Sequence, residues 1–269
     1  MPDMTETPAL DPRVPLLRMT GIVKRFPGVV ALSGVHLKAY AGEVLALMGE
    51  NGAGKSTLMK ILGGAYQPDE GEIQIDGQPV VFDSVRTAKN LGIALIHQEL
   101  MLAPNLDITA NIFLGSEPKS MGIFSPLNRA RLNDIAAGLL KRVGLPMKPT
   151  TPLASLTVGE MQMVEIAKAL STNARVIIMD EPTSSLTAGE SARLFKIIDQ
   201  LKAQGIAVIY ISHRMEEVFK LADRITVLRD GKYVGDVARA DAAHEKIVAM
   251  MVGRELSANY FPPKVHVPL

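Results

Sequence analysis

The chain has 269 residues, a length that fits one large domain or two small ones. Its 29 Lys and Arg residues almost balance its 28 Asp and Glu residues, and a net charge of +1 gives no electrostatic footprint for nucleic acid or an anionic membrane surface. The chain has no cysteine, which excludes disulfides and thiolate metal sites, and it has no apolar run of the ~18–20 residues that span a bilayer.

The first predicted elements are an antiparallel unit and a buried strand. Residues 1–15 lack an apolar stretch, so we expect a disordered tail there. Residues 16–26 and 29–40 mix apolar and polar side chains as strands do, and Pro27 and Gly28 separate them. We expect these two strands to form an antiparallel β edge that leads into a central sheet. The apolar run 44–48 is the first predicted strand of that sheet.

A glycine-rich loop follows this strand and carries the strongest signal in the chain. Its nine residues match the phosphate-binding pattern G-x-x-x-x-G-K-[ST], and residues 58–62 continue from it with helical character. The glycines allow backbone N–H groups to approach phosphate oxygens closely. We expect Lys55 to meet the β- and γ-phosphates and the Ser56 hydroxyl to bind Mg²⁺. The nine residues are Gly49, Glu50, Asn51, Gly52, Ala53, Gly54, Lys55, Ser56 and Thr57.

The middle of the chain changes from short elements to longer helical runs. The sequence predicts a hairpin of residues 72–75 and 79–82, a helix over 85–90 that Asp83 or Ser84 caps, and a buried strand over 93–96. From Gln98 to about Gly144 the pattern is helical, most clearly over residues 128–143. We therefore expect an inserted helical subdomain, and a further helix over 158–170.

Two carboxylates end the next predicted strand. Residues 176–179 include no polar side chain, so this strand is expected to be central and parallel. Asp180 and Glu181 follow it at the carboxyl edge of the sheet, where ligands of such sheets bind. Asp180 can hold Mg²⁺ directly or through water, and Glu181 is free to polarise an attacking water. An acidic helix cap is the plainer alternative.

The last third of the chain continues the alternation of strands and helices. We expect a helix over 191–204, a buried strand over 206–211, a hairpin of 225–228 and 233–237, and an amphipathic helix over 244–252. Together the elements predict an α/β fold. It would have a phosphate-loop core with a mostly parallel sheet, an antiparallel β edge and an inserted helical subdomain.

The segment 156–162 opens the helix before the carboxylate strand. Thr157 is placed to cap this helix with its hydroxyl, and a helix start of this kind can receive an anion. Taken alone, the segment would be an ordinary capped helix.

With these motifs in this order, the chain resembles the nucleotide-binding subunit of an ABC transporter over about residues 16–253. The resemblance implies an ATPase that binds ATP with Mg²⁺. The implied catalytic residues are Glu181, His213 and Gln98, and the implied metal ligands are Ser56, Gln98 and Asp180. The implied nucleotide contacts are Phe26, which stacks on adenine, the loop residues 49–57, and Thr157 and Gly159 of the signature motif.

Two motifs depart from the family pattern. The signature is Leu-Thr-Val-Gly-Glu, where the family usually has Leu-Ser-Gly-Gly-Gln, so Val158 and Glu160 weaken the match. Thr157 keeps the hydroxyl for the γ-phosphate, and Gly159 keeps the close backbone approach. Thr187 replaces the usual aspartate of the next loop, but it opens a capping box with Glu190 that preserves a helix start.

The same departures resemble one branch of the family, the ATPases of monosaccharide importers of the ribose and galactose type. That branch usually fuses two ATP-binding domains, and this chain resembles the first of them. We expect an ATP-binding domain over 16–253, with its helical subdomain at about 99–165, and a tail or linker stub over 254–269. The chain is then either a half-length subunit that pairs with itself or part of a longer protein.

The resemblance also implies partners and a place in the cell. Two ATP-binding domains would enclose ATP between them at the cytoplasmic face of the cell membrane, where membrane-spanning permease subunits use the closure, and a solute-binding protein would act outside. Residues 100–104 are a candidate contact for a permease segment, or else part of the helical core. The alternatives are a soluble ABC ATPase that acts on nucleic acid or ribosomes, and a binding module that barely hydrolyses ATP. Long coiled coils and basic arms, typical of the former, are not seen in the sequence.

Overall fold

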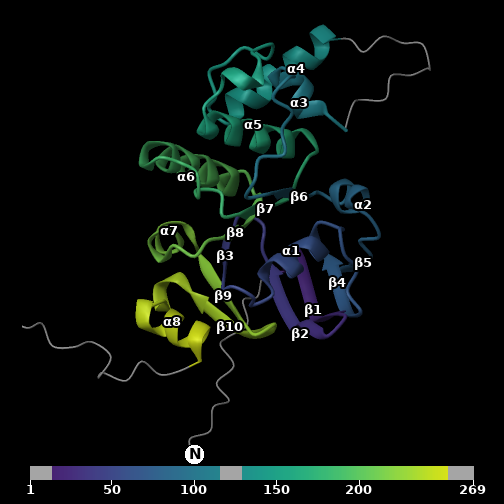
Figure 1. Cartoon of the computed structure of the whole chain (residues 1–269), viewed down its shortest axis with the longest axis vertical. Helices are drawn as coiled ribbons and strands as arrows, with labels where there is room; N and C mark the ends of the chain where they lie inside the picture. The colour runs from purple at the N-terminus through teal and green to yellow at the C-terminus, as the bar shows by residue number, and fades with distance from the viewer. Residues whose placement is uncertain (1–13, 116–128, 254–269) are drawn as a thin grey trace, which may run out of the picture.

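A computed structural model describes residues 14–115 and 129–253, which form two β-sheets with helices around them (Figure 1). The central sheet has six strands in the order β10-β9-β3-β8-β7-β6. Its five strands from β9 to β6 are parallel, and β10 pairs antiparallel with β9. The strands are β3 Val44–Met48, β6 Ile93–Ile96, β7 Val176–Asp180, β8 Ala207–Ile211, β9 Arg224–Arg229 and β10 Lys232–Ala238. The predicted central position of the strand at 176–179 is confirmed.

The predicted antiparallel strands form a second sheet. Its order is β2-β1-β4-β5, with β1 at Leu17–Phe26, β2 at Val29–Ala39, β4 at Glu70–Ile75 and β5 at Gln78–Val80. Strand β1 pairs antiparallel with β2 on one side and with β4 on the other, and β4 also pairs with β5. These four strands form a sheet that is separate from the six-stranded sheet.

Eight α-helices surround the two sheets within the described residues. Helices α3, α4 and α5 contact one another and lie at the top of Figure 1, away from the antiparallel sheet. This arrangement matches the predicted helical insertion, whose boundaries remain predictions. The helices are α1 Lys55–Leu62, α2 Val85–Asn90, α3 Ile108–Phe113, α4 Arg129–Arg142, α5 Val158–Ser171, α6 Ala188–Ala203, α7 Met215–Leu221 and α8 His244–Val252.

Several helix details refine the sequence predictions. Ser84 is the side chain that caps α2, where it accepts the Thr87 N–H at 3.2 Å. Helix α6 begins three residues before the predicted start, directly after the Thr187 cap. Helices α3 and α7 were not predicted individually, since six or seven residues are too few to show helical periodicity. Residue 128, the predicted start of the helix observed as α4, lies outside the described residues, as do residues 1–13 of the tail predicted at 1–15 and the tail predicted at 254–269. Of the remaining tail residues, Val14 is exposed and Pro15 is buried.

Burial on both faces fixes the central strands. All residues of β3 and β8 are buried, and alternate residues of β7 face opposite cores. Ile177 and Met179 pack against the side of α5 and α6, whereas Val176 and Ile178 pack toward α1 and the second sheet. Each fully buried side chain of this size contributes about 1.5–3 kcal/mol. The strands therefore hold the loops at their carboxyl ends in fixed positions.

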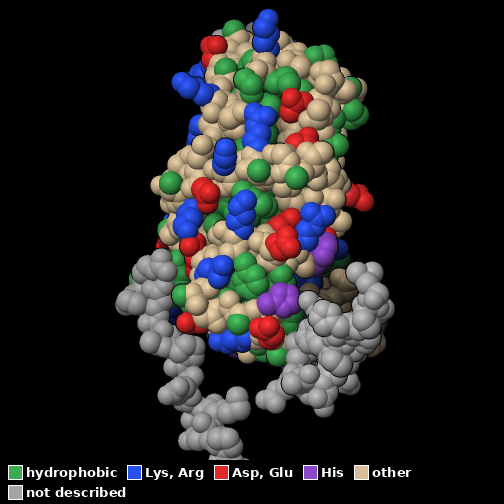
Figure 2. All heavy atoms as spheres, turned by 90° about the vertical axis from the view of Figure 1, so that its left-hand side faces the viewer, with side chains coloured by type: hydrophobic (Ala, Val, Ile, Leu, Met, Phe, Trp, Pro, Cys, Tyr) green, Lys and Arg blue, Asp and Glu red, His purple; other side chains and the backbone are tan. Residues whose placement is uncertain are grey.

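No helix in the described ranges 14–115 and 129–253 combines the length and hydropathy that crossing a bilayer requires. Charged side chains of both signs are interspersed over the face that Figure 2 presents, and the apolar side chains there form only small groups.

Candidate functional site

A cavity of about 530 Å³ lies where the carboxyl ends of β3 and β7 meet, a volume within the usual range for a small-molecule site. It brings together side chains from the glycine-rich loop, the end of β6 and the end of β7. The predicted site residues that line it are Asn51, Gly52, Gly54, Lys55, Ser56, Thr57, Gln98, Asp180 and Glu181. The structure therefore brings these distant segments together around one cavity, and the roles of the residues stay predictions.

Two glycines allow the loop to pack against its walls. A Cβ on Gly49 would lie 2.4 Å from the Leu228 carbonyl oxygen. Gly54 has φ +96°, and a Cβ there would lie 2.6 Å from a Leu32 methyl group. Both positions exclude any other residue without movement of the loop. The loop is thus pressed against β9 on one side and β2 on the other, and its N–H groups are held around the cavity.

Lys55 is the first residue of α1 and points back into the loop. Its ammonium donates to the carbonyl oxygens of Gly49 at 2.6 Å and Glu50 at 3.0 Å. Burial lowers the pKa of Lys55, although the charges of Glu181 and Asp180 oppose that shift. A partly buried cation that meets only backbone carbonyls is well suited to attract an anion at the helix start.

Glu181 and His213 meet at the edge of the cavity. Oε1 of Glu181 lies 3.1 Å from Nδ1 of His213, whose side chain is 65% exposed. Glu181 has φ +45°, which is rare for a residue other than glycine, and its N–H donates to the Ile211 carbonyl at 2.9 Å. Such a backbone is retained where surrounding structure imposes it, often at functional sites. The pair thus joins an exposed imidazole to a carboxylate whose charge acts on Lys55.

Asp180 is a partly buried carboxylate of the site whose environment disfavours its charged form. Burial and the neighbouring Glu181 charge raise its pKa, and the positive charges of His97 and Lys55 only partly oppose the rise. A carboxylate with a raised pKa is one that gains from a nearby cation. The position therefore suits a ligand that brings positive charge.

Replacing Asp180 by asparagine should raise the thermal midpoint of the ligand-free protein by a few degrees at pH 8. Since the folded pKa of Asp180 lies above its unfolded value, the ionised group destabilises the fold above that folded pKa. This destabilisation decreases as the pH falls through the folded-state pKa of Asp180. The thermal midpoints of the two proteins should therefore become equal at about pH 4. Thermal unfolding at both pH values checks this, and a lower midpoint for the variant at pH 8 would contradict it.

The signature residues Thr157 and Gly159 do not line the cavity. Thr157 caps α5, where its hydroxyl accepts the Glu160 N–H at 3.3 Å and its own N–H donates to the Glu160 carboxylate at 2.8 Å. The Gly159 N–H donates to Glu190 Oε1 at 3.2 Å. Glu160, where the family usually has Gln, is thus the third helical residue of a capping box, a place that either residue type can fill.

Phe26 ends β1, directly before the turn that leads to the cavity wall. Its ring makes an edge-to-face contact with Tyr66 at 5.4 Å between centroids, and the Lys24 ammonium lies 5.6 Å from its centroid. It is not among the residues that line the cavity. Its assignment to adenine stacking remains a prediction.

Sequence reasoning missed one wall of the cavity. The start of β2 and the turn between β9 and β10 both reach the phosphate loop, and they contribute Val29, Val30, Ala31, Asp230 and Gly231. The Ser33 N–H of β2 donates to the Gly231 carbonyl at 2.7 Å and joins the strand to the turn. The Asp230-Gly231 turn itself was predicted, but no local signal places it beside residues almost 200 positions earlier.

The residues present fit a nucleotide with Mg²⁺. Mg²⁺ usually takes one or two carboxylates together with phosphate and water oxygens, and does not need a cage of protein ligands. Residues 14–115 and 129–253 contain no group of three or more His, Asp or Glu side chains arranged for a metal. The cavity instead offers the hydroxyl of Ser56, the amide of Gln98 and the carboxylate of Asp180 beside a cationic phosphate loop.

Comparison with known families and structures places this geometry in context. A family model described as ABC transporter matches residues 32–184. The crystal structure of a nucleotide-free ATP-binding cassette from an ABC transporter is 25% identical, with a TM-score of 0.78, over 90% of this chain and 100% of that one. A dimeric bacterial ABC transporter cassette is 26% identical, with a TM-score of 0.70, over 83% of this chain and 98% of that one.

Curated relatives are longer than this chain. A ribose/galactose/methyl galactoside import ATP-binding protein of Burkholderia lata is 53% identical over 97% of the chain and 50% of the relative. The ribose import ATP-binding protein RbsA of Clostridium perfringens is 52% identical over 92% of the chain and 49% of the relative. The chain spans about half the length of these relatives.

Proposed function

Because the chain belongs to the ABC transporter family, we propose that it is an ATP-hydrolysing cassette that powers import of a monosaccharide or a similar small polar solute. The observation that carries the proposal is the meeting of Lys55, Gln98 and Asp180 with the Glu181–His213 pair around one cavity. The relatives' names, which give ribose and galactose import, support the solute class.

The roles of the chain's own residues follow from their positions. The Lys55 ammonium binds the β- and γ-phosphates of ATP, and Glu181 accepts a proton from the attacking water. His213 holds the Glu181 carboxylate through the 3.1 Å contact. Ser56, Gln98 and Asp180 would hold Mg²⁺, which would supply stabilisation of negative charge in the transition state.

The positions of Thr157 and Gly159 support a second cassette in the cycle. Thr157 is exposed at the start of α5, Gly159 is buried there against Glu190, and neither lines the chain's own cavity, so we assign the nucleotide that this helix start would contact to a partner. The partner is either a second copy or a fused second cassette. ATP favours closure because donors from both cassettes meet its γ-phosphate, and hydrolysis removes that link.

Release of phosphate from ATP by the purified chain tests the enzymatic proposal. We expect hydrolysis with Mg²⁺, and a loss of about 100-fold or more when EDTA removes the metal, since the metal offsets several kcal/mol of charge in the transition state. Manganese should restore activity, because it accepts the same oxygen ligands. Undiminished hydrolysis in EDTA would refute the proposed metal role, and failure to bind ATP would refute the function.

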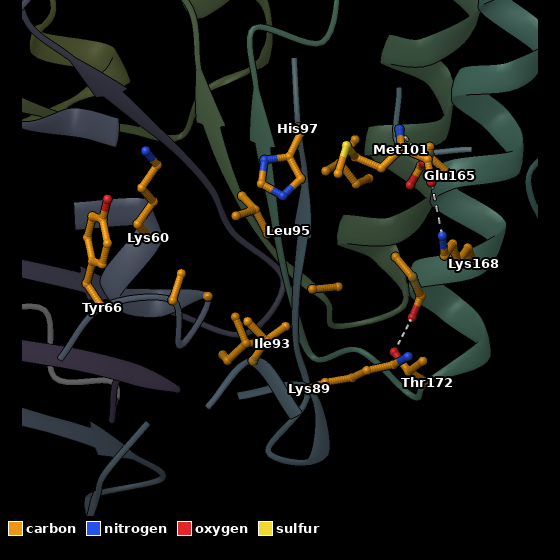
Figure 3. Close-up of a pocket in the computed structure, with 16 residues that line it drawn as sticks. Lys60, Tyr66, Lys89, Ile93, Leu95, His97, Met101, Glu165, Lys168 and Thr172 are labelled. Atoms are coloured by element: carbon orange, nitrogen blue, oxygen red, sulfur yellow. Dashed lines mark hydrogen bonds between the residues drawn. The ribbon is translucent and has the colours of Figure 1, made fainter. Parts of the chain in front are cut away.

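A groove of about 400 Å³ is the proposed contact for a membrane-spanning permease subunit (Figure 3). It lies between the β-sheets and the helical insertion, and Leu95, His97 and Met101 project into it. The Met101 side chain is 64% exposed, although its backbone is held: its N–H donates to the buried Glu165 at 3.1 Å. An exposed apolar side chain on a fixed backbone suits a docking surface. We propose that the cassette works at the cytoplasmic face of the membrane, and its membership of the ABC transporter family supports this location.

Replacing Met101 by aspartate should reduce assembly with the permease subunits about tenfold or more, because a charge would be desolvated in the groove. The fold should be unaffected, since only the exposed side chain changes. Val81→Asp is the matched control, because Val81 is 72% exposed and does not line the groove. Co-purification with the permease measures the effect. Equal recovery of both variants would refute the groove as the contact.

A further inference from the structure

A buried carboxylate behind the catalytic pair has no role in the mechanism described above. Glu217 lies on α7, the helix that follows His213, and is only 9% exposed. A buried charge is costly unless donors surround it. Its neighbour Glu216 is exposed on the same helix and therefore serves as a comparison for a carboxylate that is not buried.

Glu217 is surrounded by donors. The Thr183 hydroxyl lies 2.8 Å from each carboxylate oxygen, the Tyr210 hydroxyl donates to Oε2 at 2.7 Å, and the Ser212 hydroxyl donates to Oε2 at 3.1 Å. The Arg214 guanidinium adds a contact of 3.3 Å to Oε1. The three hydroxyl-bearing residues are themselves buried. Together these bonds satisfy the hydrogen-bonding capacity of the buried carboxylate.

The donors come from strand β8, which carries Tyr210, and from the two loops that carry the catalytic pair. Thr183 follows Glu181 by two residues, and Ser212 directly precedes His213. These loops leave β7 and β8, which are parallel neighbours, and α7 lies beside them (Figure 1). Arg214 closes the turn, because its N–H donates to the Ser212 hydroxyl at 3.0 Å. One side chain therefore ties both loops together directly behind Glu181 and His213.

The catalytic pair depends on the relative position of these loops. The Glu181–His213 contact of 3.1 Å joins one side chain from each, and the left-handed backbone of Glu181 needs support from its surroundings. The Glu181 N–H bond to Ile211 and the hydrogen bonds of Glu217 to Thr183 and Ser212 are further polar links at this point. A displacement of about 1 Å at a reacting group can reduce a rate about 100-fold.

We propose that Glu217 is a positioning residue that sets the Glu181–His213 geometry for ATP hydrolysis. The inference rests on the proposed ATPase function. Glu217 does not line the cavity and does not contact the reacting atoms of the residues that do. It therefore acts through Glu181 and His213. Loss of its charge should loosen both loops and reduce turnover, whereas nucleotide binding at the phosphate loop should persist.

The direct test compares Glu217→Gln with the matched control Glu216→Gln. We expect Glu217→Gln to lower kcat about 10- to 100-fold, as the sensitivity of rate to alignment suggests, with KM for ATP and the ATP dissociation constant within about threefold. Glu216→Gln removes the same charge from an exposed position of the same helix and should retain full activity. Equal kcat for the two variants would overturn the proposal.

A double-mutant cycle separates positioning from general stability. In a His213→Ala background, Glu217→Gln should lower kcat by less than about threefold, since residues that act as a unit are not additive. An undiminished effect in that background would show that Glu217 does not act through the pair.

If Glu217→Gln does not fold, Tyr210→Phe removes one of the hydrogen-bond donors to Glu217 without a change of shape, and the same cycle with this variant decides. An unmutated chain that binds but does not hydrolyse ATP would instead count against the proposed function.

Discussion

Replacing Lys55 by alanine should weaken ATP binding about 100-fold or more and abolish turnover. Lys55 carries the only positive charge among the described residues that line the cavity. Charge-assisted hydrogen bonds contribute about 1.5–3 kcal/mol each, and the loss of two corresponds to at least about 100-fold in affinity. Titration with a fluorescent ATP analogue measures the change.

Lys60→Ala is the control for the Lys55 variant. Lys60 lies on the same helix, but its ammonium is 5.5 Å from the Tyr66 ring centroid and it lines the groove in place of the cavity. The control should bind ATP as the unmutated chain does. If the two variants bound ATP equally well, the assignment of the phosphates to Lys55 would be wrong.

Replacing Glu181 by glutamine should reduce ATP hydrolysis about 100- to 10,000-fold, the range for removal of a general base, and leave ATP affinity within about threefold. Glutamine keeps the shape and still meets His213, but it cannot accept the proton of the attacking water. Phosphate release under single-turnover conditions measures the step. Turnover near the unmutated rate would refute the role of Glu181 as general base.

Local motifs made part of the site predictable. The loop at 49–57 can be identified from sequence because glycine, lysine and hydroxyl positions are all fixed within nine residues. Asp180 and Glu181 could also be identified from the sequence, since an apolar strand directly precedes them. Gln98 and His213 carry weaker local signals, and their assignment required the resemblance to a family. The structure places both with the rest of the site through the order of the parallel strands.

Features that depend on long-range pairing could not be predicted in this way. Residues 29–31 and Asp230 reach the cavity because β2 and β10 flank the phosphate loop, which no periodicity reveals. The capping box of Thr187 and Glu190 was evident from their spacing, whereas the bond from Gly159 to Glu190 spans 31 positions. Likewise, the donors around Glu217 come from strand β8 and from the loops that follow β7 and β8, which lie together because these two strands pair in the sheet.

Light scattering of the Glu181→Gln protein, with and without ATP and Mg²⁺, tests the central claim most directly. With a second copy as the partner, we expect a monomer without nucleotide and a dimer with it, because blocked hydrolysis retains the γ-phosphate between the cavity of one copy and the Thr157–Gly159 start of α5 of the other. A protein that stays monomeric while ATP saturates its cavity would contradict pairing with a second copy and would leave a fused second cassette as the partner.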